Sequence, residues 1–127
     1  MALGYTVGAN TSNSLDRVYQ SYSDLFGNSL WSWGYNLYGQ LGVGDVTHRS
    51  SPVQVGTLTT WSGVSGGGFH SLALKTDGTL WSWGYNLYGQ LGLGDTTYRS
   101  SPVQVGSLTT WSGVSGSYYH CLALQNY

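Results

Sequence analysis

One block of residues occurs twice in the chain, fifty positions apart, and this repeat constrains the fold more than any other feature. Residues 30–74 align with residues 80–124 without a gap, and eight of the 45 aligned positions differ. The repeat is rich in glycine and aromatic side chains: the chain has 20 glycines, 6 tryptophans and 11 tyrosines. A period near fifty with this composition favours the blades of a β-propeller over a helical solenoid.

Alternating side chains predict a hairpin that joins the two repeats. In residues 70–74, His70, Leu72 and Leu74 face one way and the side chains between them face the other way. The dipeptide Asp77-Gly78 suits a tight hairpin turn, and residues 80–83 alternate again before Gly84.

Other parts of the repeat predict shorter elements. We expect strands around residues 53–55 and 58–64, with Pro52 at a strand start, where a missing N–H donor is tolerated. The glycine-containing stretch 34–51 is expected to be a surface loop.

Composition and charge indicate an all-β protein and exclude several kinds of partner. Helix-forming Glu, Lys and Ala are scarce, whereas Gly, Ser, Thr, Val, Tyr and Trp are abundant. The net charge of −1 gives no basic surface for nucleic acid. No apolar run approaches the roughly 20 residues of a membrane helix, so no membrane insertion is expected. The first ten residues lack the pattern of a secretory signal peptide.

Three motifs carry a resemblance to a known family. W-G-Y-N-x-Y-G-Q-L-G-x-G-D and S-P-V-Q-V are followed by H-S-L-A-L-K-T-D-G-T-L-W-S-W-G. Together they resemble the repeat of the regulator of chromosome condensation family over most of the chain. The resemblance implies a propeller of four-stranded blades, about seven in one chain. It also implies guanine-nucleotide exchange on small GTPases for some relatives, and inhibitor, scaffold or surface roles for others.

The repeat divides the chain into three parts. Residues 1–29 lie outside it, residues 30–79 form a first blade repeat, and residues 80–127 form a second. Two blades do not close a ring, so we expect copies of the chain to complete one by homo-oligomerisation. Three copies would give six blades and four copies eight; the trimer is favoured.

The predicted interface lies at the two ends of the repeated region. Residues 120–124 lack a following hairpin strand, and residues 30–33 lack a preceding one. We expect the first to pair with the second of the next copy, head to tail. The predicted interface residues are Leu30, Trp31, Trp33, His120, Leu122 and Leu124. In the alternative, residues 18–26 fold back on residues 30–33, or residues 1–29 anchor the ring elsewhere.

Positions that differ between the repeats indicate candidate binding loops. They include His48 against Tyr98, and residues 67–69 against residues 117–119. Tyr and His contact sugars and protein epitopes by stacking and adaptable hydrogen bonding. The predicted ligand-binding residues are Tyr35, Tyr38, His48, Tyr85, Tyr88, Tyr98 and Tyr118. In the alternative, Tyr35 and Tyr38 only pack their loop onto the blade.

No catalytic, metal or cofactor site is predicted. His70 and His120 have no further ligand at useful spacing, and each is expected to hydrogen-bond to the backbone of a neighbouring blade. Asp45 and Asp95 are expected to cap their own loops. Cys121 is expected to pack as a small, unreactive residue.

The sequence therefore predicts a non-enzymatic, ring-forming propeller that acts as a structural or surface binding module. Its expected partners are other copies of itself and a glycan or surface protein. A phage virion or fibre component, or an extracellular surface, is the favoured setting. The alternative is an exchange-type GTPase regulator or a protein-inhibitor propeller.

Overall fold

The computed structural model describes residues 27–126, which fold into antiparallel sheets without a helix. The strands are β1 (Trp31–Gly34), β2 (Arg49–Gln54), β3 (Trp61–Gly66), β4 (His70–Lys75), β5 (Leu80–Gly84), β6 (Arg99–Gln104), β7 (Trp111–Gly116) and β8 (Cys121–Gln125). The expected all-β class is confirmed. The expected strand of residues 18–26 lies outside the described residues.

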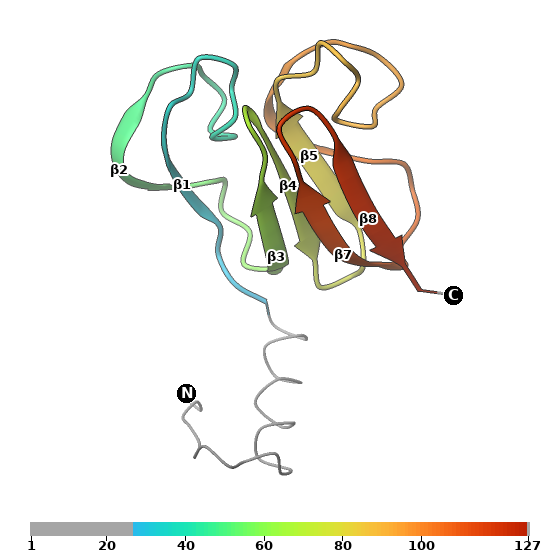
Figure 1. Cartoon of the computed structure of the whole chain (residues 1–127). Helices are drawn as coiled ribbons and strands as arrows, with labels where there is room; N and C mark the ends of the chain where they lie inside the picture. Colours follow the sequence, from blue (N-terminus) through green and yellow to red (C-terminus); the bar gives the residue numbers. More distant parts are fainter. Residues whose placement is uncertain (1–26, 127) are drawn as a thin grey trace, which may run out of the picture.

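The strands form one complete four-stranded sheet, flanked by two half-sheets (Figure 1). The complete sheet has the order β3-β4-β5-β6, whereas β1 pairs with β2 and β7 pairs with β8. By the fifty-residue repeat, β1-β2 corresponds to β5-β6, and β7-β8 corresponds to β3-β4. The complete sheet therefore joins the last two strands of the first repeat to the first two of the second. The domain boundaries given above stay a prediction.

The hairpin expected from the alternation is confirmed. Strands β4 and β5 pair from His70 opposite Gly84 to Leu74 opposite Leu80. The turn between them is closed by a bond from the Gly78 N–H to the Lys75 carbonyl. The Asp77 carboxylate accepts bonds from the Thr79 N–H and hydroxyl at 3.0 and 2.6 Å.

Two of the shorter strands differ from expectation. β2 begins at Arg49, inside the stretch expected to be loop, and Pro52 lies within it rather than at its start. The strand tolerates a proline because β2 is an edge strand, whose outward positions need no N–H donor. β3 begins at Trp61, later than expected, since Leu58 belongs to an exposed loop.

The main core lies between the first half-sheet and the complete sheet. It contains the buried side chains of Leu30, Val55, Trp61, Ala73 and Trp83. The Trp83 indole N–H donates to the Gln40 carbonyl at 2.8 Å, so this tryptophan ties β5 to the loop after β1. A Cβ at Gly42 would lie 2.6 Å from the same indole nitrogen, and only glycine leaves room for it.

Each long loop is organised around one buried asparagine. The side-chain amide of Asn86 donates to the Asp95 and Thr97 carbonyls at 3.0 and 2.9 Å. Its carbonyl oxygen accepts from the Leu91 N–H at 2.9 Å. Asn36 makes the same bonds in the first repeat. Both side chains are buried, so their bonds are shielded from water.

Replacing Asn86 by alanine should destabilise the protein, because the buried partners of its side chain lose their hydrogen bonds. We expect the free energy of unfolding to fall by about 2–4 kcal/mol, measured by urea denaturation. Thr96→Ala is the control, since Thr96 is exposed in the same loop. Equal stability of the two variants would contradict this account of the loop.

Candidate functional site

Nine aromatic rings gather at the end of the molecule where the long loops and two hairpin turns meet. We call them the aromatic surface: Tyr35, Tyr38, His48, Phe69, Tyr85, Tyr88, Tyr98, Tyr118 and Tyr119. The loops of residues 35–48 and 85–98 stand at the same end, uppermost in Figure 1. The rings come from all three sheets, so the surface spans the boundaries between them.

The rings contact one another in an unbroken series. Tyr35 stacks on His48 with centroids 4.8 Å apart. Tyr38 meets Tyr85 edge-on, also at 4.8 Å. The ring centroids of Phe69 and Tyr118 are 5.5 Å apart. Tyr119 then closes the series through Tyr118 and Tyr88. Edge-to-face packing at these separations is favourable and holds the rings in fixed positions.

All seven residues predicted to bind a ligand lie in this surface, and the prediction that they do bind stays untested. Sequence reasoning left out Phe69 and Tyr119. Both lie in the variable triplets 67–69 and 117–119, so their difference between repeats was the signal that marked them. The structure adds that these triplets turn toward the long loops.

The aromatic surface exposes apolar area together with hydroxyl groups. Tyr88 is the most exposed tyrosine of this surface, at 63%, and Tyr118 and Tyr119 follow at 52% each. Burial, with the neighbouring Tyr98 hydroxyl, raises the pKa of Tyr85 to about 12. The Tyr85 phenol therefore stays neutral at any physiological pH and remains a hydrogen-bond donor.

The charged side chains beside the aromatic surface are paired. Arg49 contacts Asp45 at 2.8 Å, and Arg99 contacts Asp95 at the same distance. The hydrogen bond from each arginine lowers the pKa of its aspartate. Each aspartate also accepts from a backbone N–H two residues later, the loop cap expected from the sequence. These four charges stabilise the loops and leave the surface close to neutral.

The predicted interface residues, with one exception, lie exposed on the two half-sheets. Leu122 and Leu124 are 67% and 69% exposed, whereas Leu72 and Leu74, their equivalents in the complete sheet, are 3% and 7% exposed. Trp33 is 60% exposed, and its equivalent Trp83 is 2% exposed.

The other three predicted interface residues differ in exposure. Trp31 and His120 are also exposed. Leu30 is buried within its own chain, because it packs against Val55 in the main core. Whether these residues form an interface stays a prediction.

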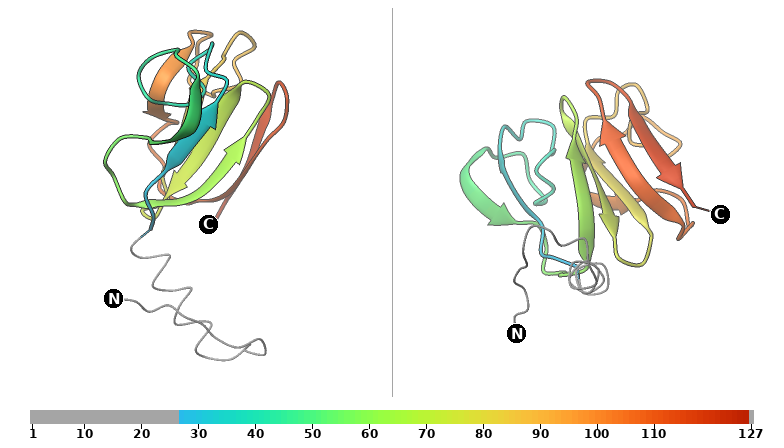
Figure 2. Two further views of the ribbon diagram at one scale, coloured as in Figure 1. Left: turned by 90° about the vertical axis from the view of Figure 1, so that its left-hand side faces the viewer. Right: turned by 60° about the horizontal axis from the view of Figure 1, so that its bottom comes forward.

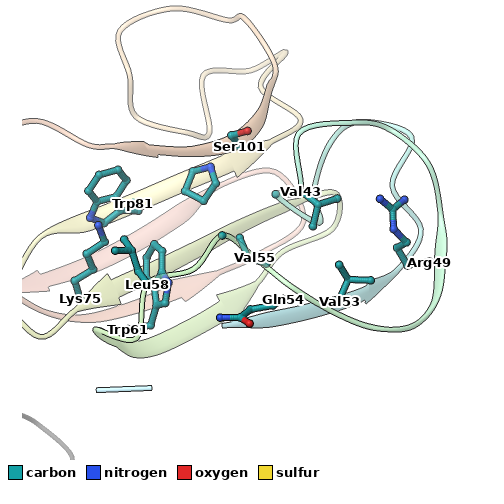
Figure 3. Close-up of a pocket in the computed structure, with 13 residues that line it drawn as sticks. Val43, Arg49, Val53, Gln54, Val55, Leu58, Trp61, Lys75, Trp81 and Ser101 are labelled. Atoms are coloured by element: carbon teal, nitrogen blue, oxygen red, sulfur yellow. The ribbon is translucent and has the colours of Figure 1, made fainter. Parts of the chain in front are cut away.

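An apolar groove that the sequence did not predict lies between the first half-sheet and the complete sheet (Figure 3). It has a volume of about 510 Å³, and Val43, Val53, Val55, Leu58, Trp61 and Trp81 supply its apolar lining. The Lys75 ammonium lies 3.8 Å from the centroid of Trp81 and 5.1 Å from that of Trp61. This cation–π arrangement holds the lysine over the groove.

His70 and Cys121 join the complete sheet to the second half-sheet. His70 Nε2 lies 3.0 Å from Cys121 Sγ, and the thiol donates to the Gln90 carbonyl at 3.1 Å. Burial lowers the pKa of His70 and raises that of Cys121 to about 11. Both groups are therefore neutral near pH 7. Cys121 packs between the two sheets, as expected from the sequence, and its low reactivity stays a prediction.

Within the described part of the chain, no three His, Cys, Asp or Glu side chains lie close enough together to hold a metal ion. No helix among residues 27–126 is long and apolar enough to cross a membrane.

Comparison with known proteins identifies the repeat. The profile of the regulator of chromosome condensation (RCC1) repeat matches residues 28–74 and 77–124, and a second RCC1 profile matches residues 61–90. The chain belongs to the RCC1 repeat family. The resemblance drawn from the motifs is thereby confirmed. No curated protein matches the sequence.

Solved RCC1-type propellers share the fold. Yeast RCC1 (Prp20) bound to Kap60 is 24% identical, with a TM-score of 0.66 over 76% of this chain and 26% of that one. Human WBSCR16 is 28% identical, with a TM-score of 0.64 over 77% of this chain and 27% of that one. Prp20p from Saccharomyces cerevisiae, described with its binding to Gsp1p and histones, is 25% identical, with a TM-score of 0.67 over 77% and 27%. The chain thus spans about a quarter of the length of each.

The pKa of His70 predicts how stability depends on pH. Because the folded state lowers this pKa below the unfolded value near 6.5, the unfolded chain binds the proton more readily. Stability should therefore fall as the pH is lowered from 7.5 to 5.5, seen as a lower melting temperature. In His70→Gln, this fall should be smaller.

Thr96→Ala is the control for this prediction, since Thr96 is exposed and has no ionisable side chain. It should retain the pH dependence of the wild type. If His70→Gln also retained it in full, His70 would not be the group responsible.

Proposed function

We propose that this chain is a non-catalytic protein-binding module, and that the aromatic surface is its binding site. The observation that carries the proposal is the continuous set of nine rings across all three sheets. Tyrosine offers a large, rigid contact area with a hydroxyl group, at little cost in side-chain entropy. Such rings are frequent among the residues that dominate binding energy at protein interfaces.

The choice of a protein partner is supported by the relatives. The solved yeast propellers are described with protein partners: Kap60, Gsp1p and histones. Those partners belong to those proteins, and this chain covers about a quarter of their length. A glycan is the other ligand class that stacks on tyrosine, and the experiment below separates the two. Exchange or inhibitor activity toward a GTPase stays a prediction, which a nucleotide-release assay would test.

We further propose that the module acts as a cyclic homo-oligomer, with a trimer of six blades favoured over a tetramer of eight. The support is the exposure of apolar side chains on the half-sheets whose equivalents in the complete sheet are buried. Assembly would display several aromatic surfaces at once, so that weak individual contacts add up. A place in a virion or on an extracellular surface stays a prediction.

The mass of the 127-residue protein in native buffer tests the assembly. We expect three times the chain mass of 13.7 kDa at micromolar concentration, measured by native mass spectrometry and by light scattering. Four times that mass would replace the trimer by the tetramer. A stable monomer would overturn the homo-oligomer.

Selection from a displayed library of short peptides, run beside a glycan array, tests the binding site. We expect enriched peptides whose affinity falls at least about tenfold with Tyr88→Ser, because this tyrosine is the most exposed one of the surface and contributes a large contact area. Leu108→Ser is the matched control, since Leu108 is a 49% exposed apolar residue outside the aromatic surface. Binding of glycans alone would overturn the choice of a protein partner, and equal binding by both variants would overturn the site.

A further inference from the structure

Among residues 27–126, each half-sheet has one edge without a partner strand, and these two edges are complementary. In the complete sheet, β4 lies beside β5. In the second half-sheet, β8, the equivalent of β4, has no strand of residues 27–126 on its other side. In the first half-sheet, β1, the equivalent of β5, lacks a described strand on its corresponding side. Each half-sheet therefore supplies the strand that would complete the other.

We infer that β8 of one copy pairs with β1 of a second copy in the register of β4 and β5, so that two half-sheets make one composite blade. This inference rests on the proposed homo-oligomer and specifies how its copies join. The complete sheet pairs Ser71 with Trp83 and Leu72 with Ser82. Moved by fifty positions, the same register sets Cys121 opposite Trp33 of the second copy. Leu122 then lies opposite Ser32, and Leu124 lies opposite Leu30.

The Gln90 carbonyl provides a place for the second copy's Trp33. In the complete sheet, the equivalent Gln40 carbonyl accepts two bonds, from the Ser71 hydroxyl at 2.7 Å and from the Trp83 indole at 2.8 Å. The Gln90 carbonyl accepts from Cys121, the equivalent of Ser71, at 3.1 Å. Among the described residues, no indole donates to it. Trp33 of the second copy would supply that bond and become buried, as Trp83 is.

The exposed leucines fit the second copy in the same way. The Cys121 side chain faces the complete sheet, because its thiol donates to the Gln90 carbonyl. Side chains alternate along a strand, so Leu122 and Leu124 face away from the complete sheet, Leu122 directly next to Cys121 and Leu124 two residues further on. In the complete sheet, Leu72 and Val114 of the neighbouring half-sheet line one small cavity. Leu122 is the equivalent of Leu72, and Val64 is the equivalent of Val114. In the assembly, Leu122 of one copy would therefore lie beside Val64 of the second copy. Val64 is 62% exposed in the single chain, although it is apolar and lies within a strand.

Glycine at position 34 agrees with this pairing. A Cβ at the equivalent Gly84 would lie 2.7 Å from the Phe69 carbonyl oxygen and 2.8 Å from the His70 Cα, both on the paired side of the sheet. At Gly34, no atom of the described residues lies within 4 Å of that position. In the composite blade, the backbone of Tyr119 and His120 from the other copy occupies this space.

Cysteine cross-linking of the 127-residue protein tests the register. The variant Trp33→Cys would place a thiol opposite the natural Cys121 of the neighbouring copy, on the same face. After mild oxidation, we expect most of the chain to migrate as covalent dimers and trimers in a non-reducing gel. Ser32→Cys is the control, because side chains of adjacent strand residues point to opposite faces and its thiol would face away from Cys121.

A second pair of cysteines is needed for two reasons. The pKa of Cys121 is raised to about 11, which slows its oxidation, and the first design removes Trp33 from the proposed interface. The triple variant Cys121→Ser, Ser32→Cys, Leu122→Cys places both thiols on the other face, and serine is the natural residue at the equivalent position 71. Neighbouring antiparallel pairs alternate between wide and narrow spacing, so one of the two designs has the narrow, disulfide-compatible spacing.

The outcomes separate the two proposals. Cross-linking by either design, with Ser32→Cys alone unlinked, supports the composite blade. If the protein has the mass of a trimer or tetramer but neither design cross-links, the register is wrong and the homo-oligomer stands. Equal cross-linking by Ser32→Cys alone also overturns the register. A protein that is monomeric by mass and never cross-links overturns both.

Discussion

The packing of one sheet face against the next is the constraint on which the rest of this structure depends. Trp83 illustrates it, because its ring is buried in the main core while its indole N–H donates to the Gln40 carbonyl in the loop that joins β1 to β2. Where a neighbouring sheet covers them, tryptophans and leucines of the repeat are buried. Where the described residues provide no neighbouring sheet, the equivalent side chains of the half-sheets remain exposed. The three sheets stand side by side, so each boundary between them is also a contact between loops (Figure 2).

The sequence predicts those parts of the fold that short-range patterns determine. Alternation over residues 70–74 and the Asp77-Gly78 turn identify β4, β5 and their connection. The start of β2 could not be predicted in this way, because hydrogen bonds around Asn36 and Asp45 determine where the loop ends. The start of β3 depends on pairing of Trp61 with Lys75, while the apolar Leu58 suggested a longer strand.

The candidate site shows a similar division. Differences between the two copies marked the loops of the aromatic surface, and residue type suggested stacking. The series of ring contacts depends on turns that bring residues 35–48, 67–69, 85–98 and 117–119 to one end, which is a property of the tertiary fold. The groove over Lys75 also escaped prediction, because Trp61 and Trp81 meet there only after β3 has paired with β4 and β4 with β5.

One difference between the repeats has a consequence for symmetry. Lys75 lies over the tryptophans of the groove, whereas the equivalent position in the second repeat is Gln125. In a closed assembly of this chain, clefts between successive blades would alternate around the circumference between those that hold a lysine and those that hold a glutamine. The blades of such a ring would have the same backbone, but the charge of the clefts would repeat once per chain rather than once per blade. An anionic ligand would meet half as many lysine-bearing clefts as there are blades.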